Sequence, residues 1–238
     1  MAYQLDEHMT TTNVFLDVAR GHYNNLKPIN IFGFNRDVGT VFETLWNDTG
    51  SYVYPSSASV LSVVSTSASD TMDVLISGLD SDYVEISETV TLTGASAVST
   101  TQAFFRINSA VILSSTNVGN ITVKIGAALH GYIEAGQGAT QACIYTVPAG
   151  KSLYLLRIDL TSGTVNPNKY LSYRQSLRSS NGRVLRVAES TWQTDQQSFD
   201  RQVPFVIGEK TDFQFEAKSS SGSNEVSIFV EGLLGWGE

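Results

Sequence analysis

Hydrophobic and polar residues alternate along most of the chain after residue 30, with the period of two that is typical of β-strands. The segments 84–92, 121–125 and 154–160 place most of their apolar residues at every second position. Gly-, Pro- and Asp-containing turns separate such segments about every 8–12 residues, a spacing that predicts a β-sandwich or jelly roll.

The last quarter of the chain shows the same alternation twice. A first apolar series ends at a Ser/Gly-rich stretch, residues 219–224, and a second series follows it directly. The pattern predicts a hairpin, whose inward-facing residues are Phe213, Phe215, Ala217, Val226, Ile228 and Val230.

Residues 1–30 lack this pattern. Thr10 to Asn13 are suitable N-caps for a short helix over residues 14–20, which Gly21 would end. We therefore expect an all-β fold of tandem β-sandwich or jelly-roll-like domains with an extended N-terminal arm. The expected boundaries are 1–30 for the arm, 31–126 for a β-sandwich and 127–238 for a second, jelly-roll-like sandwich, with one large sandwich as the alternative.

The arm holds few large apolar side chains, too few to offset the backbone entropy lost when the whole segment is ordered. Contact with a neighbour would supply the difference, so we expect the arm to pack on another subunit. The residues proposed for this contact are Leu5, Val14, Phe15, Leu16, Val18 and Leu26.

Composition supports strands rather than helices, since the chain has 29 Ser and 22 Thr but only 16% charged residues. The net charge of −8 argues against a nucleic-acid partner, because neutralising phosphates requires clustered Lys and Arg. One loose basic group is either a solvated face or a contact with an acidic neighbouring subunit; it consists of Arg174, Arg178, Arg183 and Arg186.

The single cysteine, Cys143, lies in an apolar run, so we expect a buried thiol and no intrachain disulfide. The first residues lack the basic and apolar regions of a signal peptide, and no run approaches the ~20 apolar residues of a membrane helix. We expect synthesis in a cytoplasm and no membrane partner.

Signals of catalysis are weak. His8, His22 and His130 are isolated in the sequence, and no nucleophile or nucleotide-binding motif appears, so we expect no enzyme activity, no cofactor and no metal. The acidic stretch 80–88 could hold Ca²⁺, but a capped turn with solvated carboxylates is the favoured interpretation.

One group of aromatic residues follows residue 169. Aromatic side chains between strands can bind sugars or anchor an interface, and packing in the core is an equal alternative. The candidates are Tyr170, Tyr173, Trp192 and Phe199.

Three stretches combine a turn with a following strand. They are Phe32-Gly33-Phe34-Asn35-Arg36-Asp37-Val38-Gly39-Thr40 with its continuation to Pro55, Tyr145-Thr146-Val147-Pro148-Ala149-Gly150-Lys151 with Tyr154-Leu155, and Pro204 with Glu209-Lys210-Thr211-Asp212-Phe213. These stretches resemble virion structural proteins of tailed phages, especially marine and cyanobacterial ones. The resemblance implies a β-sandwich component of the virion, such as a capsid decoration or cement, neck or fibre protein, and it implies no catalytic residues.

We therefore expect a non-enzymatic virion structural protein, made in the host cytoplasm without a signal peptide. It would form a homo-oligomer, preferably a trimer, on the capsid or at the neck or tail, in contact with proteins such as the major capsid or neck proteins. The alternative is a receptor- or glycan-binding fibre or spike protein. A polysaccharide-degrading enzyme would instead need two converging carboxylates, for example among Glu189, Asp195 and Asp200.

Overall fold

The computed structural model describes residues 14–48, 50–163 and 169–236. Within them the chain is nearly all β, which confirms the predicted fold class, and one short helix, α1 (Val14–Ala19), lies at the predicted position. No helix in these ranges is long and apolar enough to cross a bilayer.

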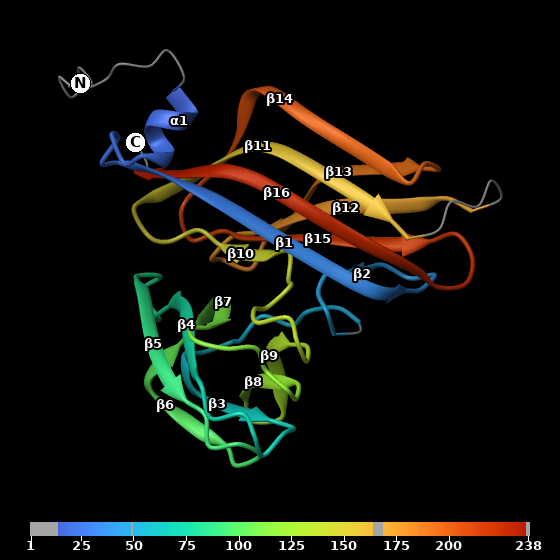
Figure 1. Ribbon diagram of the computed structural model, residues 1–238. Helices are drawn as coiled ribbons and strands as arrows, with labels where there is room; N and C mark the ends of the chain where they lie inside the picture. The colour runs from blue at the N-terminus through green and yellow to red at the C-terminus, as the bar shows by residue number, and fades with distance from the viewer. Residues whose placement is uncertain (1–13, 49, 164–168, 237–238) are drawn as a thin grey trace.

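A large sandwich forms the upper part of the molecule in Figure 1. One of its sheets has the strand order β1-β16-β11-β14, and the other has β10-β15-β12-β13 with β2 paired to β15. The strands are β1 (Leu26–Val38), β2 (Glu43–Thr44), β10 (Ile144–Thr146), β11 (Lys151–Ser162), β12 (Leu171–Arg178), β13 (Val184–Trp192), β14 (Gln196–Ile207), β15 (Asp212–Ser219) and β16 (Asn224–Trp236). Alternate residues of β15 and β16 point between the two sheets, and Phe213 and Phe215 are fully buried there.

A small sandwich lies below it in Figure 1 and has a core of its own. Its sheets have the orders β6-β3-β8-β9 and β5-β4-β7. The strands are β3 (Ser59–Ser65), β4 (Asp73–Leu79), β5 (Glu85–Thr91), β6 (Val98–Phe104), β7 (Arg106–Ile112), β8 (Ile121–Ile125) and β9 (Ala128–Ile133).

The two sandwiches are nested along the chain, which corrects the predicted tandem order. Strand β1 pairs with β16 over most of its length, so residues 26–38 belong with the C-terminal strands. The predicted boundary near Gly126 falls inside the β8–β9 hairpin. The alternation of side chains predicts where strands lie but carries no information on which distant strands pair, and this is why the boundary was misplaced.

The N-terminal arm is shorter than predicted. Residues 26–30 form the first part of β1 and pair with residues 231–235 of the same chain, which corrects the expectation that the whole of residues 1–30 leaves its own sandwich. Before them, α1 packs on β1. Any extended arm therefore ends before Leu26.

The two sheets of the large sandwich approach each other closely at Gly33 in β1. A Cβ atom at this position would lie 2.4 Å from the carbonyl oxygen of Leu45 and 2.6 Å from the Cβ of Cys143. Both contacts involve atoms that cannot move away by a side-chain rotation. Only a glycine fits this crossing without a shift of the backbone.

Replacing Gly33 with alanine should therefore lower the free energy of unfolding by about 1–3 kcal/mol, the usual cost of overpacking. Urea denaturation followed by tryptophan fluorescence measures the effect. Gly208→Ala is the matched control, because a Cβ at Gly208 meets nothing within 4 Å. Equal stability of the two variants would contradict this account of the sheet crossing.

Candidate functional site

The junction between the two sandwiches is filled by a third, smaller apolar cluster. Trp46 and Tyr52 come from the segment that leaves β2, and Ile144 comes from β10. The ring of Tyr52 packs edge-on against Trp46 at 5.2 Å, against Tyr54 at 5.0 Å and against His130 of β9 at 5.9 Å. Burial and the nearby positive charge of Arg106 lower the pKa of His130, so this ring is neutral at pH 7.

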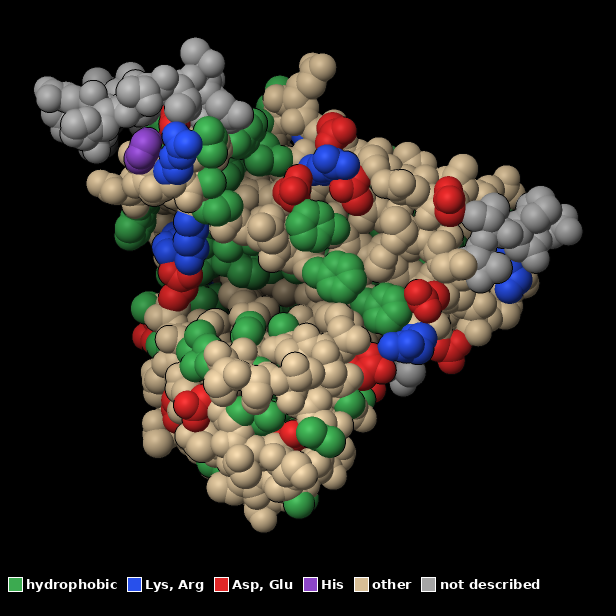
Figure 2. Space-filling view, in the orientation of Figure 1, with side chains coloured by type: hydrophobic (Ala, Val, Ile, Leu, Met, Phe, Trp, Pro, Cys, Tyr) green, Lys and Arg blue, Asp and Glu red, His purple; other side chains and the backbone are tan. Residues whose placement is uncertain are grey.

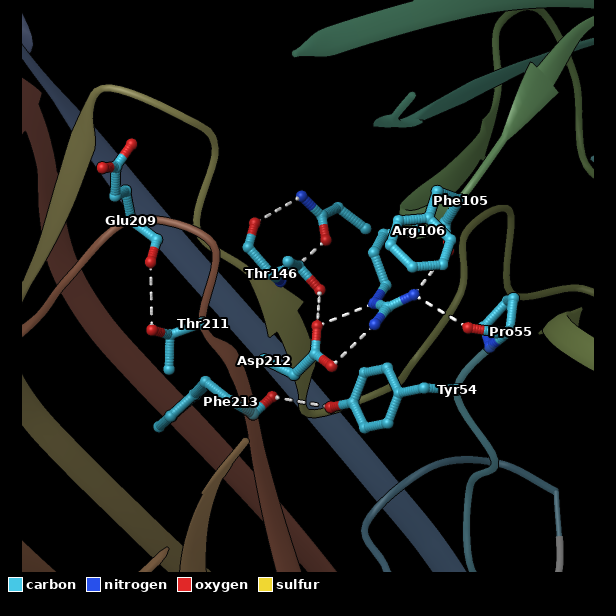
Figure 3. A network of polar contacts seen from close by, with 10 residues as sticks. Tyr54, Pro55, Phe105, Arg106, Thr146, Glu209, Thr211, Asp212 and Phe213 are labelled. Atoms are coloured by element: carbon cyan, nitrogen blue, oxygen red, sulfur yellow. Dashed lines mark hydrogen bonds and ion pairs between the residues drawn. The ribbon is translucent and has the colours of Figure 1, made fainter. Parts of the chain in front are cut away.

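A buried ion pair crosses the same junction (Figure 3). Arg106, the first residue of β7 in the small sandwich, reaches Asp212, the first residue of β15 in the large one. The Arg106 Nε and Nη2 atoms donate to the two carboxylate oxygens of Asp212 over 2.7 and 3.0 Å. Both side chains are almost fully buried. Such a bidentate pair fixes orientation as well as distance.

The remaining polar atoms of this ion pair also have partners. Arg106 Nη1 donates to the carbonyl oxygens of Pro55 and Phe105 over 3.0 and 2.9 Å, and the Thr146 hydroxyl donates to Asp212 over 2.8 Å. The guanidinium also lies 3.9 Å from the ring centre of Phe105. These contacts satisfy the groups that burial has removed from water, which is the condition for a buried pair to be tolerated.

Tyr54 lies beside the ion pair, and its hydroxyl donates to the carbonyl oxygen of Phe213 over 3.4 Å. Its ring centre is 5.2 Å from the Arg106 guanidinium. Burial raises the pKa of Tyr54 well above its usual value, and the negative charge of Asp212 adds to this effect. The phenol therefore stays protonated and acts as a donor at the junction.

Three further ion pairs lie nearer the surface of the junction. Glu85 of β5 accepts from Lys27 of β1 over 3.1 Å and also from Lys151 of β11. Burial alone would raise the pKa of Glu85, but the hydrogen bonds from the two lysines outweigh it and lower the pKa. Arg36 of β1 pairs with Glu134, which follows β9, over 2.9 Å. The sandwiches are thus joined at several points.

An open cleft of about 430 Å³ lies between β1 of the large sandwich and strands β4, β5 and β7 of the small one. Figure 2 shows the surface hollowed between the two parts of the molecule. Hydroxyl and amide side chains line much of the cleft, together with apolar residues of β1 such as Ile29 and Phe32.

Strand β13 forms an exposed edge of the large sandwich. It pairs with β12 on one side, and among the described residues no strand pairs with its other side. All of its residues except Ala188 and Trp192 are exposed, including Val184 at 51% and Leu185 at 41%. An unpaired edge with exposed apolar side chains can pair with another chain.

The four predicted interface or glycan aromatics are mostly in the core, which corrects their proposed role. Tyr173 and Trp192 are each only 5% exposed, and Phe199 packs against the same core. Their rings contact one another between the two sheets, with Tyr173 5.9 Å from Trp192 and 5.5 Å from Phe199. Tyr170 alone of the four is exposed.

The six predicted arm residues divide in a similar way. Leu5 lies outside the described residues, and Val14 begins α1. Val18 is 2% exposed and Leu26 is half-buried, so both pack within this chain, whereas Phe15 is 59% exposed. Leu16 is also exposed.

The acidic stretch 80–88 does not form one cluster, and no group of metal-binding side chains occurs in the described parts of the chain. Asp80 caps its own turn by accepting from the backbone N–H groups of Asp82 and Val84. Glu85 pairs with lysines, and Glu88 accepts from Thr101 and Gln102 on β6.

The sequence analysis did not identify Arg106 as a buried charge, although the sequence around it indicates one. A single arginine interrupts the apolar run Phe104-Phe105-Arg106-Ile107, and a charge in such a run requires a buried partner. Nothing in the sequence identifies Asp212, which is more than a hundred residues away, as that partner.

Replacing Arg106 with methionine should lower the free energy of unfolding by about 3–5 kcal/mol, because Asp212 is left buried and unpaired. The double variant Arg106→Met/Asp212→Leu should regain part of this loss. Arg36→Met, which removes an exposed pair, is the control and should cost no more than about 1 kcal/mol. Urea denaturation compares them. If the double variant is less stable than Arg106→Met, the unpaired buried charge of Asp212 is not the cause of the lost stability.

Comparison with known proteins identifies no family. No family model matches the chain, and no curated protein matches it. Two solved structures of infectious bursal disease virus show weak similarity. A structure of the Gt strain has 10% identity and a TM-score of 0.26, covering 88% of this chain and 72% of that one. The VP2 subviral particle has 11% identity and a TM-score of 0.23, covering 88% and 75%. Scores this low do not indicate a shared fold.

Proposed function

We propose that this chain is a non-enzymatic structural protein of a tailed-phage virion, and that copies of it associate through the β13 edge. The observation that carries the proposal is the exposure of both faces of this edge strand. Three stretches of the chain resemble phage virion proteins, and this resemblance supports a location in the virion. Within the virion, the chain would lie on the capsid surface as a decoration or cement protein, or it would lie at the neck or tail. Its neighbours would be proteins such as the major capsid or neck proteins.

An exposed strand edge is a liability for a protein that remains alone, because its free N–H and C=O groups pair with other strands. Natural proteins usually protect such edges with charges, prolines or covering loops. β13 carries charged residues of its own, but it also presents Val184, Leu185 and Val187 to solvent. A partner that covers this edge would bury these side chains and satisfy the backbone groups together.

The charges along β13 favour a second copy of the chain as that partner. Arg183 and Arg186 lie at the start of the strand, and Glu189 lies towards its end. Two copies that approach in antiparallel orientation bring opposite charges together, whereas a parallel approach brings like charges together. An antiparallel contact has two-fold symmetry and closes as a dimer, while the expected trimer requires two different surfaces on each copy.

Charge reversal tests the antiparallel contact. A chain with Arg183→Glu and Arg186→Glu carries an acidic edge, and a chain with Glu189→Arg carries a basic one. Each alone should self-associate more than roughly tenfold more weakly, because like charges then meet across the interface. An equimolar mixture should associate again. Sedimentation and light scattering measure the association and distinguish dimers from trimers.

Lys124→Glu on β8 of the small sandwich is the control for charge reversal and should associate like the natural chain. Each edge-reversed chain should also be depleted from purified particles when it replaces the natural chain. Unchanged association of both reversed chains would show that β13 is not the contact. A natural chain that stays monomeric and is absent from particles would refute the proposed function.

The segment before β1 is proposed as a second contact between copies. Val18 holds α1 against its own sandwich, while Phe15 on the same helix is largely exposed. A large exposed aromatic side chain is a suitable interface anchor. The proposal is limited to residues before Leu26, because β1 begins there.

A chain that lacks residues 1–24 should retain both sandwiches, since every strand of the described residues remains complete. Its far-ultraviolet circular dichroism should match that of the full chain, while its oligomeric fraction by light scattering should fall. Phe15→Ser in the full chain should lower association in the same direction. Unchanged association of the shortened chain would mean that the segment serves only its own subunit.

A further inference from the structure

The cleft between the sandwiches contains side chains with unused hydrogen-bonding capacity. Asn30 projects from β1, Ser77 from β4, Ser87 from β5 and Ser109 from β7. Within the described ranges, none of these four side chains has a hydrogen-bond partner in the protein. They differ from Asn108 in the same cleft, whose amide exchanges two hydrogen bonds with the backbone of Thr146.

The charges that line the cleft are already paired. Lys27 and Glu85 bind each other, and Glu85 also accepts from Lys151. A charged ligand would have to compete with these contacts or enter without a counter-charge. The cleft therefore favours an uncharged ligand that both donates and accepts hydrogen bonds.

Apolar surface lies next to these polar groups. Phe32 is 40% exposed at the cleft, and Ile29 and Ile86 are partly buried beside it. A ligand that fits must combine hydroxyl groups with an apolar face. The rings of sugars have both properties, because their hydroxyls lie around the edge and their C–H groups form patches on the faces.

We propose that this cleft binds a neutral saccharide of about disaccharide size. Its volume of about 430 Å³ lies within the range of ~300–1,000 Å³ that is typical of small-ligand sites. Its two walls come from different sandwiches, and the Arg106–Asp212 pair holds those walls in place. A site whose walls are fixed beforehand loses less entropy when a ligand binds.

Nuclear magnetic resonance titration of the full chain with four neutral disaccharides tests the proposal: maltose, cellobiose, lactose and chitobiose. At least one of them should shift the amide signals of cleft residues on both β1 and β7. Asn30→Ala and Ser109→Ala should each weaken that binding about 2- to 12-fold, the effect expected for one lost hydrogen bond. Neither change affects a buried contact, so both variants should remain folded.

Ser81→Ala is the matched control, since Ser81 is exposed but lies outside the cleft. Its affinity should equal that of the natural chain. The proposal is overturned if no neutral disaccharide shifts the cleft signals at millimolar concentration. It is also overturned if the neutral disaccharides shift only amide signals outside the cleft, or if a uronic-acid disaccharide binds in the cleft while the neutral ones do not. A loss of affinity in Ser81→Ala as large as that in Asn30→Ala would overturn it as well. The β13 charge-reversal variants leave the cleft unchanged, so the outcomes for assembly and for sugar binding are independent.

Discussion

A guanidinium group that has lost its water must have an acceptor in a fixed position. Arg106 meets this requirement with a carboxylate from the other sandwich and with two backbone carbonyl groups. The aromatic cluster around Tyr52 excludes water from the same region. Because a buried charge tolerates little displacement from its partner, the relative position of the two sandwiches is set there. The cleft and the ionic contacts around the junction depend on that position.

The small sandwich is inserted between strands of the large one along the chain, and this arrangement also constrains how the two sandwiches lie relative to each other. The chain enters the small sandwich after the segment that includes Tyr54 and Pro55, and it returns through residues 139–143 into β10. Two covalent connections therefore cross the junction, and both pass beside the buried cluster. A single linker would leave one sandwich free to swing about the other, whereas two connections and a buried ion pair resist such a motion. The molecule therefore has two separate cores that are joined by two chain connections and a buried ion pair.

The sequence was sufficient to predict strands but not their partners. Alternating residues in 121–125 and 154–160 mark strands that the structure contains. The series that ends at Ala217 and the one that begins at Val226 are also strands, but they belong to opposite sheets instead of forming the predicted hairpin. Both arrangements bury the same alternate side chains, so the pattern cannot distinguish them. The predicted interface or glycan-binding role of the aromatic residues was wrong for a related reason. The residues around Trp192 are polar and exposed, while the ring itself points into the core.

The pairing of β1 with β16 has a mechanical consequence. Leu26 lies opposite Gly235, so the start of one strand and the end of the other are at the same end of the sheet (Figure 1). A force that pulls these two points apart loads the hydrogen bonds of the pair one after another, as in opening a zipper. A force between Leu26 and the far end of β16 would load them all at once. The large sandwich is therefore weak along the first direction and strong along the second, so the points at which it is tethered would determine how much tension it can bear.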